Sequence, residues 1–142
     1  MSAVEWLVDH HRAKERERRQ MVDELCLQPS DHILDSACGP GLWTRLFAEK
    51  VAGRGKVTGL DFSSELLDYA QASLRDDPLA SAVEFVLGDL HDPPFPPESF
   101  DVTFLGNCLC YISDVAEVLE KHKKLTRRGG RVISKDFDGS VA

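Results

Sequence analysis

Ile33-Leu34-Asp35-Ser36-Ala37-Cys38-Gly39-Pro40-Gly41-Leu42-Trp43 is the stretch that decides the predicted fold. An apolar run ends at an acid, small residues follow, and the chain turns at Gly39-Pro40-Gly41. The next apolar residues, Leu42, Leu46 and Phe47, are spaced for one face of a helix. This order predicts a strand, a glycine turn and a helix. In α/β folds, this unit places a ligand at the carboxyl end of the strand. Glycine suits such a turn because it bends sharply and brings no Cβ against a ligand.

Composition narrows the class of protein. The chain has 142 residues, 42% of them hydrophobic, which is enough for one globular domain with a core. A formal charge of -7 argues against a surface for nucleic acid or for an anionic membrane, so we expect neither as a partner. The four cysteines show no CxxC pair and no zinc-like spacing with histidine, which predicts free thiols and no metal site. Without a signal-like start or a membrane-length apolar run, we expect a soluble, cytoplasmic protein.

Predicted strands and helices alternate along the chain. Residues 3–27 are predicted as one helix, and we treat 1–28 as an N-terminal helical segment that could cap the ligand site. The remainder, 29–142, is predicted as an α/β domain. Its strands are expected at 32–37, 56–61, 83–87, 100–106 and 131–137, and its helices at 41–52, from Ser63 or Ser64 to before Pro78, and from Ser113 or Asp114 to Gly129, with a stiff proline loop at 92–97. The alternation predicts a doubly wound, mostly parallel sheet with helices on both faces.

Acids stand at or near the ends of the first three predicted strands, at Asp35, Asp61 and Asp89. Because the carboxyl ends of neighbouring parallel strands share one edge of the sheet, we expect these side chains to converge. Asp61 follows Gly41 by 20 residues, where nucleotide-binding folds of this class place the acid that binds both ribose hydroxyls. Asp89 is placed to accept a hydrogen bond from an exocyclic amine such as that of adenine.

In these residues the chain resembles the class I S-adenosylmethionine-dependent methyltransferases, most closely the group that acts on small molecules. The resemblance runs from about His32 to Phe137. It rests on Asp35–Gly41 as the glycine-rich first motif, Asp61-Phe62 as the residues that hold ribose and flank adenine, Gly88-Asp89-Leu90 as the adenine-side motif, Phe100-Asp101-Val102 through Asn107 as the fourth-strand motif, and Leu125–Ile133 as the turn into strand five. Each motif is weak alone, but five in this order at compatible spacing favour the family.

The resemblance implies S-adenosylmethionine as cofactor, S-adenosylhomocysteine as product and a small-molecule methyl acceptor as partner. The implied cofactor-binding residues are Asp35, Ala37, Gly39, Gly41, Asp61, Phe62, Gly88, Asp89, Leu90 and Asn107. Asp35 either only orients the loop through backbone N–H groups or, as the resemblance implies, also reaches the cofactor's amine through water. The implied reaction is direct displacement, in which an acceptor O, N or C attacks the sulfonium methyl and no covalent enzyme nucleophile is needed.

Two features depart from the family pattern. Ala37 stands where the family usually has its first glycine; its small side chain should fit, with slight crowding of the methionine moiety. The family's sheet also continues past strand five with two further strands, one of them antiparallel, and this sequence stops at Ala142. We therefore expect either a fragment or strands supplied by another segment. The exposed edge of strand five, with Val132 and Ile133, would then be available for pairing into a homo-oligomer.

No motif singles out a catalytic residue, and the candidates are His91, Tyr111 and His11. His91 could face the transferred methyl or act as a base, or it could be an ordinary exposed loop histidine, and His11 poses the same alternatives. Tyr111 could belong to the core or to a pocket wall. Asp101 is expected to support the start of strand four, and His122, on an apolar helix stripe, to lie in the core or at its boundary.

Two other functions stay open. The chain could be a non-catalytic module that binds the cofactor, or nothing, and serves a partner through its open sheet edge. It could also be a nicotinamide-dependent oxidoreductase, but the third glycine of that fingerprint would fall at position 44, which is Thr44. Neither Asp35 nor Asp89 has a natural role in such an enzyme.

Overall fold

The fold contains one parallel sheet. The computed structural model describes residues 2–12, 14–106 and 109–135, so the predicted cofactor residue Asn107 lies outside the described residues. The described strands are β1 (His32–Ser36), β2 (Lys56–Asp61), β3 (Val83–Leu87), β4 (Phe100–Gly106) and β5 (Thr126–Lys135). They form a sheet of order β3-β2-β1-β4-β5 in which every neighbouring pair is parallel. The predicted doubly wound sheet is confirmed.

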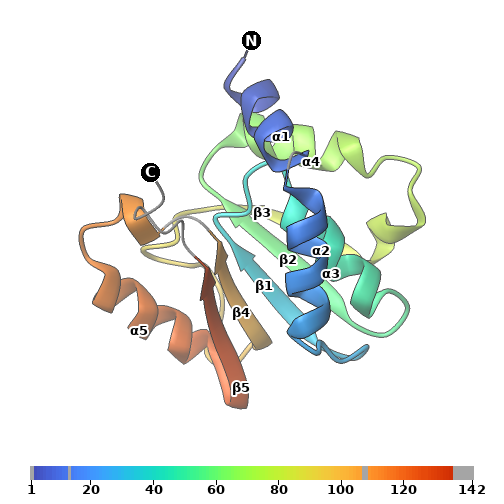
Figure 1. Ribbon diagram of the computed structural model, residues 1–142. Coiled ribbons are helices and arrows are strands. Elements are labelled where there is room, and N and C mark those ends of the chain that lie inside the picture. The colour runs from blue at the N-terminus through green and yellow to red at the C-terminus, as the bar shows by residue number, and fades with distance from the viewer. Residues whose placement is uncertain (1, 13, 107–108, 136–142) are drawn as a thin grey trace.

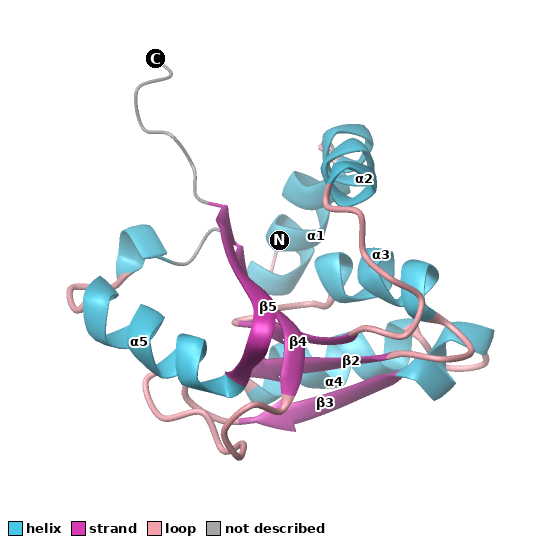
Figure 2. Ribbon diagram, turned by 90° about the horizontal axis from the view of Figure 1, so that it is seen from below, coloured by secondary structure: helices cyan, strands magenta, loops and turns pink. Residues whose placement is uncertain are grey.

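Helices cover both faces of this sheet (Figures 1 and 2). They are α1 (Ala3–Arg12), α2 (Glu15–Glu24), α3 (Leu42–Val51), α4 (Ser64–Ser73) and α5 (Val115–Leu125), with short 3-10 turns η1 (Pro78–Ala82) and η2 (Leu109–Tyr111). Alternate residues of β1 face the two layers: Ile33 packs with Phe47 of α3, and Leu34 with Leu125 of α5. The proline loop, which is neither helix nor strand, closes the α5 face, since Phe95 contacts Phe100 edge-on at 5.2 Å.

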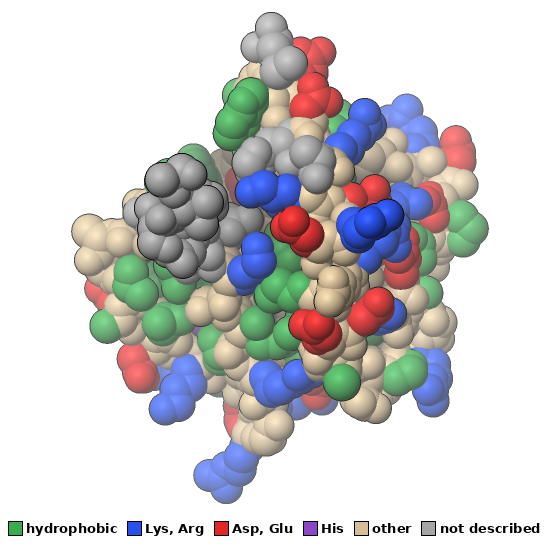
Figure 3. All heavy atoms as spheres, in the orientation of Figure 1, with side chains coloured by type: hydrophobic (Ala, Val, Ile, Leu, Met, Phe, Trp, Pro, Cys, Tyr) green, Lys and Arg blue, Asp and Glu red, His purple; other side chains and the backbone are tan. Residues whose placement is uncertain are grey.

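The prediction of one helix over residues 3–27 is wrong, because the structure has two. Lys14, with φ -116° and ψ 14°, precedes α2 outside the helical region. The polar stretch in the middle offers no apolar stripe to hold a straight helix against the molecule. The break instead lets Val8 of α1 and Val22 of α2 both become buried. Charged side chains of both signs lie over the α2 side of the molecule (Figure 3), and two of their ion pairs, Arg19–Glu49 and Lys50–Asp23, join α2 to α3.

The predicted end of the last helix at Gly129 is also wrong, because α5 ends at Leu125 and β5 begins at Thr126. Thr126 Oγ1 donates to the His122 carbonyl at 2.8 Å and lies 2.8 Å from Thr103 Oγ1, so it joins the helix end to the neighbouring strand. Residues 127–130 then bulge out opposite a single residue of β4 before regular pairing resumes. Beyond the bulge β5 pairs only with β4 among the described residues, which agrees with the exposed edge expected there.

Two simpler expectations concern the thiols and the membrane. Among the residues that the structure describes, Cys26 and Cys38 are free thiols. Within the same residues, no helix has both the length and the apolar composition that crossing a bilayer would require.

Candidate cofactor site

The candidate site lies where the order of the strands changes direction. β1 has β2 on one side and β4 on the other, so the loops that follow β1 and β4 diverge at the carboxyl edge of the sheet. In open α/β sheets this divergence forms the crevice in which ligands bind. The loop after β1 contains three residues in the left-handed region: Ala37 (φ 59°), Gly39 (φ 56°) and Gly41 (φ 86°). A Cβ on Gly41 would lie 3.0 Å from Ala70 Cβ, so only glycine lets the loop pack this closely against α4.

Asp61 connects the ends of three strands. One of its carboxylate oxygens accepts the backbone N–H of Gly39 at 2.8 Å, and the other accepts that of Ser63 at 2.9 Å. Its own carbonyl accepts the N–H of Gly88 at 2.9 Å, directly before Asp89. The Asp61 side chain, only 5% exposed, therefore fixes the glycine loop after β1 and connects it to the predicted adenine-side loop.

Asp35 is buried at the end of β1 and takes a side-chain partner rather than the backbone partners considered from the sequence. Thr44 Oγ1, in the first turn of α3, donates to its carboxylate at 2.6 Å. Burial raises the pKa of Asp35 to about 7; the Thr44 hydroxyl lowers it and the nearby Asp61 raises it. Asp35 therefore changes charge near neutral pH, at the base of the glycine loop.

The residues predicted to flank adenine lie at the ends of β2 and β3. Phe62, next to Asp61, is 79% exposed, so its ring is available for stacking. Gly88 is close-packed, since a Cβ there would lie 3.0 Å from Leu60 Cδ1. Asp89 is exposed and Leu90 is partly buried. The predicted residues of these two motifs therefore share one edge of the sheet.

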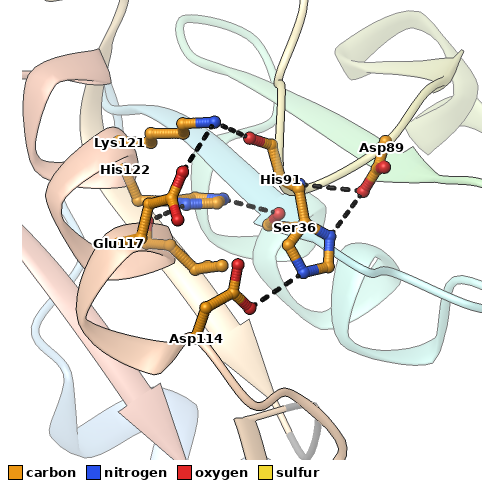
Figure 4. A network of polar contacts seen from close by, with 8 residues as sticks. Ser36, Asp89, His91, Asp114, Glu117, Lys121 and His122 are labelled. Atoms are coloured by element: carbon orange, nitrogen blue, oxygen red, sulfur yellow. Dashed lines mark hydrogen bonds and ion pairs between the residues drawn. The ribbon is translucent and has the colours of Figure 1, made fainter.

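The catalytic candidates fall in different surroundings. His91 lies between the carboxylates of Asp89 and Asp114, as Figure 4 shows. Tyr111 is 87% exposed and so is not a core residue. His11 belongs to α1, and its side chain is outside the part of the chain that the structure describes.

Asp101 and His122 have the structural roles expected from the sequence. Asp101 accepts the backbone N–H of His32 at 2.8 Å, at the opposite end of the strands from the site. His122 is fully buried; its ring lies 2.8 Å from the Val118 carbonyl through Nδ1 and 2.8 Å from Ser36 Oγ through Nε2. Burial lowers the pKa of His122, which keeps the imidazole neutral.

A cationic group around Trp43 was missed by sequence reasoning. The Trp43 side chain is buried, and its indole Nε1 has no hydrogen-bond partner among the described residues. The Arg18 guanidinium lies 5.4 Å from the Trp43 ring centroid, and Lys135 Nζ lies 5.9 Å from it. A Cβ on Gly106 would approach Trp43 Nε1 to 3.2 Å, which places this group at the carboxyl end of β4. The available signal was spacing, because Arg18 precedes the buried Val22 by one helical turn.

A groove in the described part of the surface does not coincide with these residues. This groove of about 690 Å³ runs between α4 and the start of β3, lined in part by Gln71, Arg75 and Phe85. It lies toward the amino end of β3 and includes none of the predicted cofactor residues. The candidate site is defined by its loops and side chains and not by this groove.

Replacing Ala37 by glycine should stabilise the chain by about 1 kcal/mol, because a Cβ in the left-handed region is strained. Urea denaturation measures the change. The matched control is Gly39→Ala at φ 56°, where a new Cβ meets nothing within 4 Å and adds only backbone strain. It should destabilise by a similar amount. Equal signs for the two substitutions would contradict the prediction.

The sheet order and the glycine loop define an α/β protein of the doubly wound class. The methyltransferase domain family matches residues 33–130, and the chain belongs to this family. It is 33% identical over 133 residues to a demethylmenaquinone methyltransferase of Symbiobacterium thermophilum, covering 94% of this chain and 50% of that protein. The resemblance inferred from the motifs is thereby confirmed.

Solved structures share the fold. A SAM-dependent methyltransferase of Aquifex aeolicus superposes with a TM-score of 0.78 at 22% identity, over 87% of this chain and 65% of that one. The geranyl diphosphate C-methyltransferase of Streptomyces coelicolor, whose structure contains S-adenosyl-L-homocysteine, superposes with a TM-score of 0.77 at 20% identity. The match covers 87% of this chain and 46% of that one. The chain spans about half the length of the curated relatives it matches.

Proposed function

We propose that this chain binds S-adenosylmethionine at the carboxyl ends of β1, β2 and β3 and supports methyl transfer to a small-molecule acceptor. The observation that carries the proposal is the glycine loop fixed by Asp61, with an exposed aromatic ring, Phe62, beside it. Membership in the methyltransferase domain family supports the same function.

The residues of the site suit this cofactor. A Cβ on Gly39 would meet nothing within 4 Å, so the outer side of the loop leaves room for a ligand. Each Asp61 oxygen accepts one backbone N–H and has capacity for a further donor, such as a ribose hydroxyl. The buried indole N–H of Trp43 is a donor without a partner in the described residues, and Arg18 and Lys135 add positive charge beside it.

The charges of these groups suit different parts of the cofactor. When bound, S-adenosylmethionine supplies a methyl group activated by its sulfonium. Asp61 would hold the ribose hydroxyls, and Asp35 would face the ammonium of the amino-acid portion. Arg18, Lys135 and the Trp43 N–H would face its carboxylate. The protein's part in the reaction is to align the acceptor with the methyl and to exclude water, and no covalent nucleophile is assigned.

The acceptor is proposed to bind on the β4–β5 side of the loop, since the cofactor residues occupy the β2–β3 side. Relatives named demethylmenaquinone methyltransferase favour an aromatic, quinone-like acceptor. α1 and α2 would border this side as a cap. A cytoplasmic location and pairing through the β5 edge stay predictions.

Titration calorimetry with S-adenosylhomocysteine tests the proposal. We expect one site per chain, with NADH failing to compete. Methyl transfer from labelled S-adenosylmethionine to quinol-like acceptors then tests the reaction. Absence of S-adenosylhomocysteine binding would overturn the proposal. Binding without turnover would favour the non-catalytic module instead.

A further inference from the structure

We propose that His91 is a positioning residue for the cofactor: its imidazolium orients Asp89 toward adenine and links the loop after β3 to α5. This inference rests on the proposed function, because it assumes that Asp89 accepts the adenine amine. The motifs assign no such role to His91, whose alternatives from the sequence were a residue facing the transferred methyl, a base and an exposed loop histidine.

The contact with Asp89 leaves one carboxylate oxygen available. His91 Nδ1 lies 2.8 Å from Asp89 Oδ1, and the His91 backbone N–H donates to the same oxygen at 2.9 Å. Asp89 Oδ2 accepts no hydrogen bond from the described residues, and 64% of the side chain is exposed. His91 therefore fixes the rotation of the carboxylate through Oδ1, which leaves Oδ2 available for the exocyclic amine of adenine.

The other side of the ring contacts the residue that precedes α5 (Figure 4). His91 Nε2 lies 3.2 Å from Asp114 Oδ1. Asp114 is the residue that precedes α5, but its side chain caps no backbone N–H of that helix. Lys121 Nζ donates to the His91 carbonyl and forms an ion pair with Glu117 at 3.6 Å. The loop that contains Asp89 is thus attached at two points to the helix that follows β4.

The double link requires a protonated ring. A neutral imidazole carries one N–H and can donate to only one of the two carboxylates, whereas an imidazolium donates to both. The charged groups around His91 are Asp89, Asp114, Glu117 and Lys121. The hydrogen bond to Asp89 raises the pKa of His91 above its usual value of 6.5, and the charge of Asp114 adds to this. Both donations are present below about pH 6.5, and one of them is lost as pH rises through the raised pKa of His91.

This dependence has the opposite sign to that of Asp35. As pH rises through about 7, Asp35 ionises and should hold the cofactor's ammonium more tightly. As pH rises through the pKa of His91, the ring can no longer donate to both Asp89 and Asp114, so Asp89 is held less firmly and affinity should fall. A pH profile of the native chain contains both effects, so a variant at position 91 is needed to separate them.

The test measures S-adenosylhomocysteine affinity by calorimetry at pH 6.0 and 8.5 for the native chain and for His91→Gln. Exposed ion pairs contribute little free energy, so the expected effect is small. We expect His91→Gln to weaken binding about threefold at pH 6.0 and to leave it unchanged at pH 8.5. Asp114→Ala removes one arm of the link and should reproduce part of the loss. His32→Gln, which changes a half-buried histidine at the amino end of β1, is the matched control and should leave the ratio of the two affinities native.

Nuclear magnetic resonance gives an independent readout. The ring signal of His91 is identified by its absence in His91→Gln, and its titration is followed with and without S-adenosylhomocysteine. Because linkage is reciprocal, the ligand should raise the pKa of His91. Equal affinity ratios in the native chain and His91→Gln, or a His91 titration unmoved by the ligand, would overturn this inference and leave the cofactor site intact. Absence of S-adenosylhomocysteine binding at either pH would overturn the proposed function together with it.

Discussion

Asp61→Ala is expected to lower the affinity for S-adenosylhomocysteine about a hundredfold or more. The variant removes an acceptor for two ribose hydroxyls, and charge-assisted hydrogen bonds contribute roughly 1.5–3 kcal/mol each. It also releases the Gly39 N–H that Asp61 holds at 2.8 Å, so the glycine loop loses its fixed shape. Calorimetry at pH 7 measures the affinity, and urea denaturation measures the accompanying loss of stability.

Asp101→Ala is the matched control for this loss of stability. Like Asp61, Asp101 accepts hydrogen bonds with both carboxylate oxygens. One oxygen accepts the backbone N–H of His32 at 2.8 Å, and the other accepts from the Arg127 guanidinium at 3.2 Å. It does so at the amino ends of the strands, away from the site. We expect Asp101→Ala to be destabilised but to bind S-adenosylhomocysteine normally. Equal affinity losses in the two variants, or unchanged affinity in Asp61→Ala, would remove Asp61 from the site.

The parts of the fold that follow from local patterns were predictable. The order of strand, glycine turn and helix around Gly39 and Gly41 fixes a parallel crossover, and repetition of that unit gives the sheet. The break between α1 and α2 was not predictable in this way. Helix propensity runs through Lys14 without a glycine or proline, and only burial of Val8 and Val22 on the folded molecule selects two helices.

For the site, too, the sequence predicts the features that follow from local patterns but not the tertiary contacts. The acids at strand ends follow from the edge that parallel strands share, so Asp61 could be placed from sequence. Its bond to Gly39 and the bond from Thr44 to Asp35 are tertiary contacts that no spacing rule contains. Arg18 was indistinguishable in sequence from the solvated arginines around it, and only its packing over the Trp43 ring sets it apart.

Asp35→Asn should stabilise the chain and weaken the site at once. The amide oxygen can still accept from Thr44 Oγ1, so the substitution removes mainly the charge. Because burial raises the pKa of Asp35 to about 7, the native chain loses stability as pH rises from about 4 through 7, where the unfolded carboxyl is ionised and the folded one is not. The variant lacks this loss, so its free energy of unfolding should exceed the native value by roughly 2–4 kcal/mol at pH 8 and by little at pH 4.

Binding should move the other way, because the neutral amide no longer attracts the cofactor's ammonium. We expect the affinity for S-adenosylhomocysteine to fall about tenfold at pH 8, because the variant loses one charge-assisted hydrogen bond. The fall should be much smaller at pH 6, where native Asp35 is mostly protonated. Asp77→Asn is the control with the opposite sign, since the Leu79 N–H and Arg45 lower the pKa of Asp77. That variant should be less stable than the native chain at neutral pH. An Asp35→Asn variant that is no more stable than the native chain at pH 8 would contradict the prediction. It would show that ionising the buried Asp35 does not destabilise the fold, which would require a cation beside it.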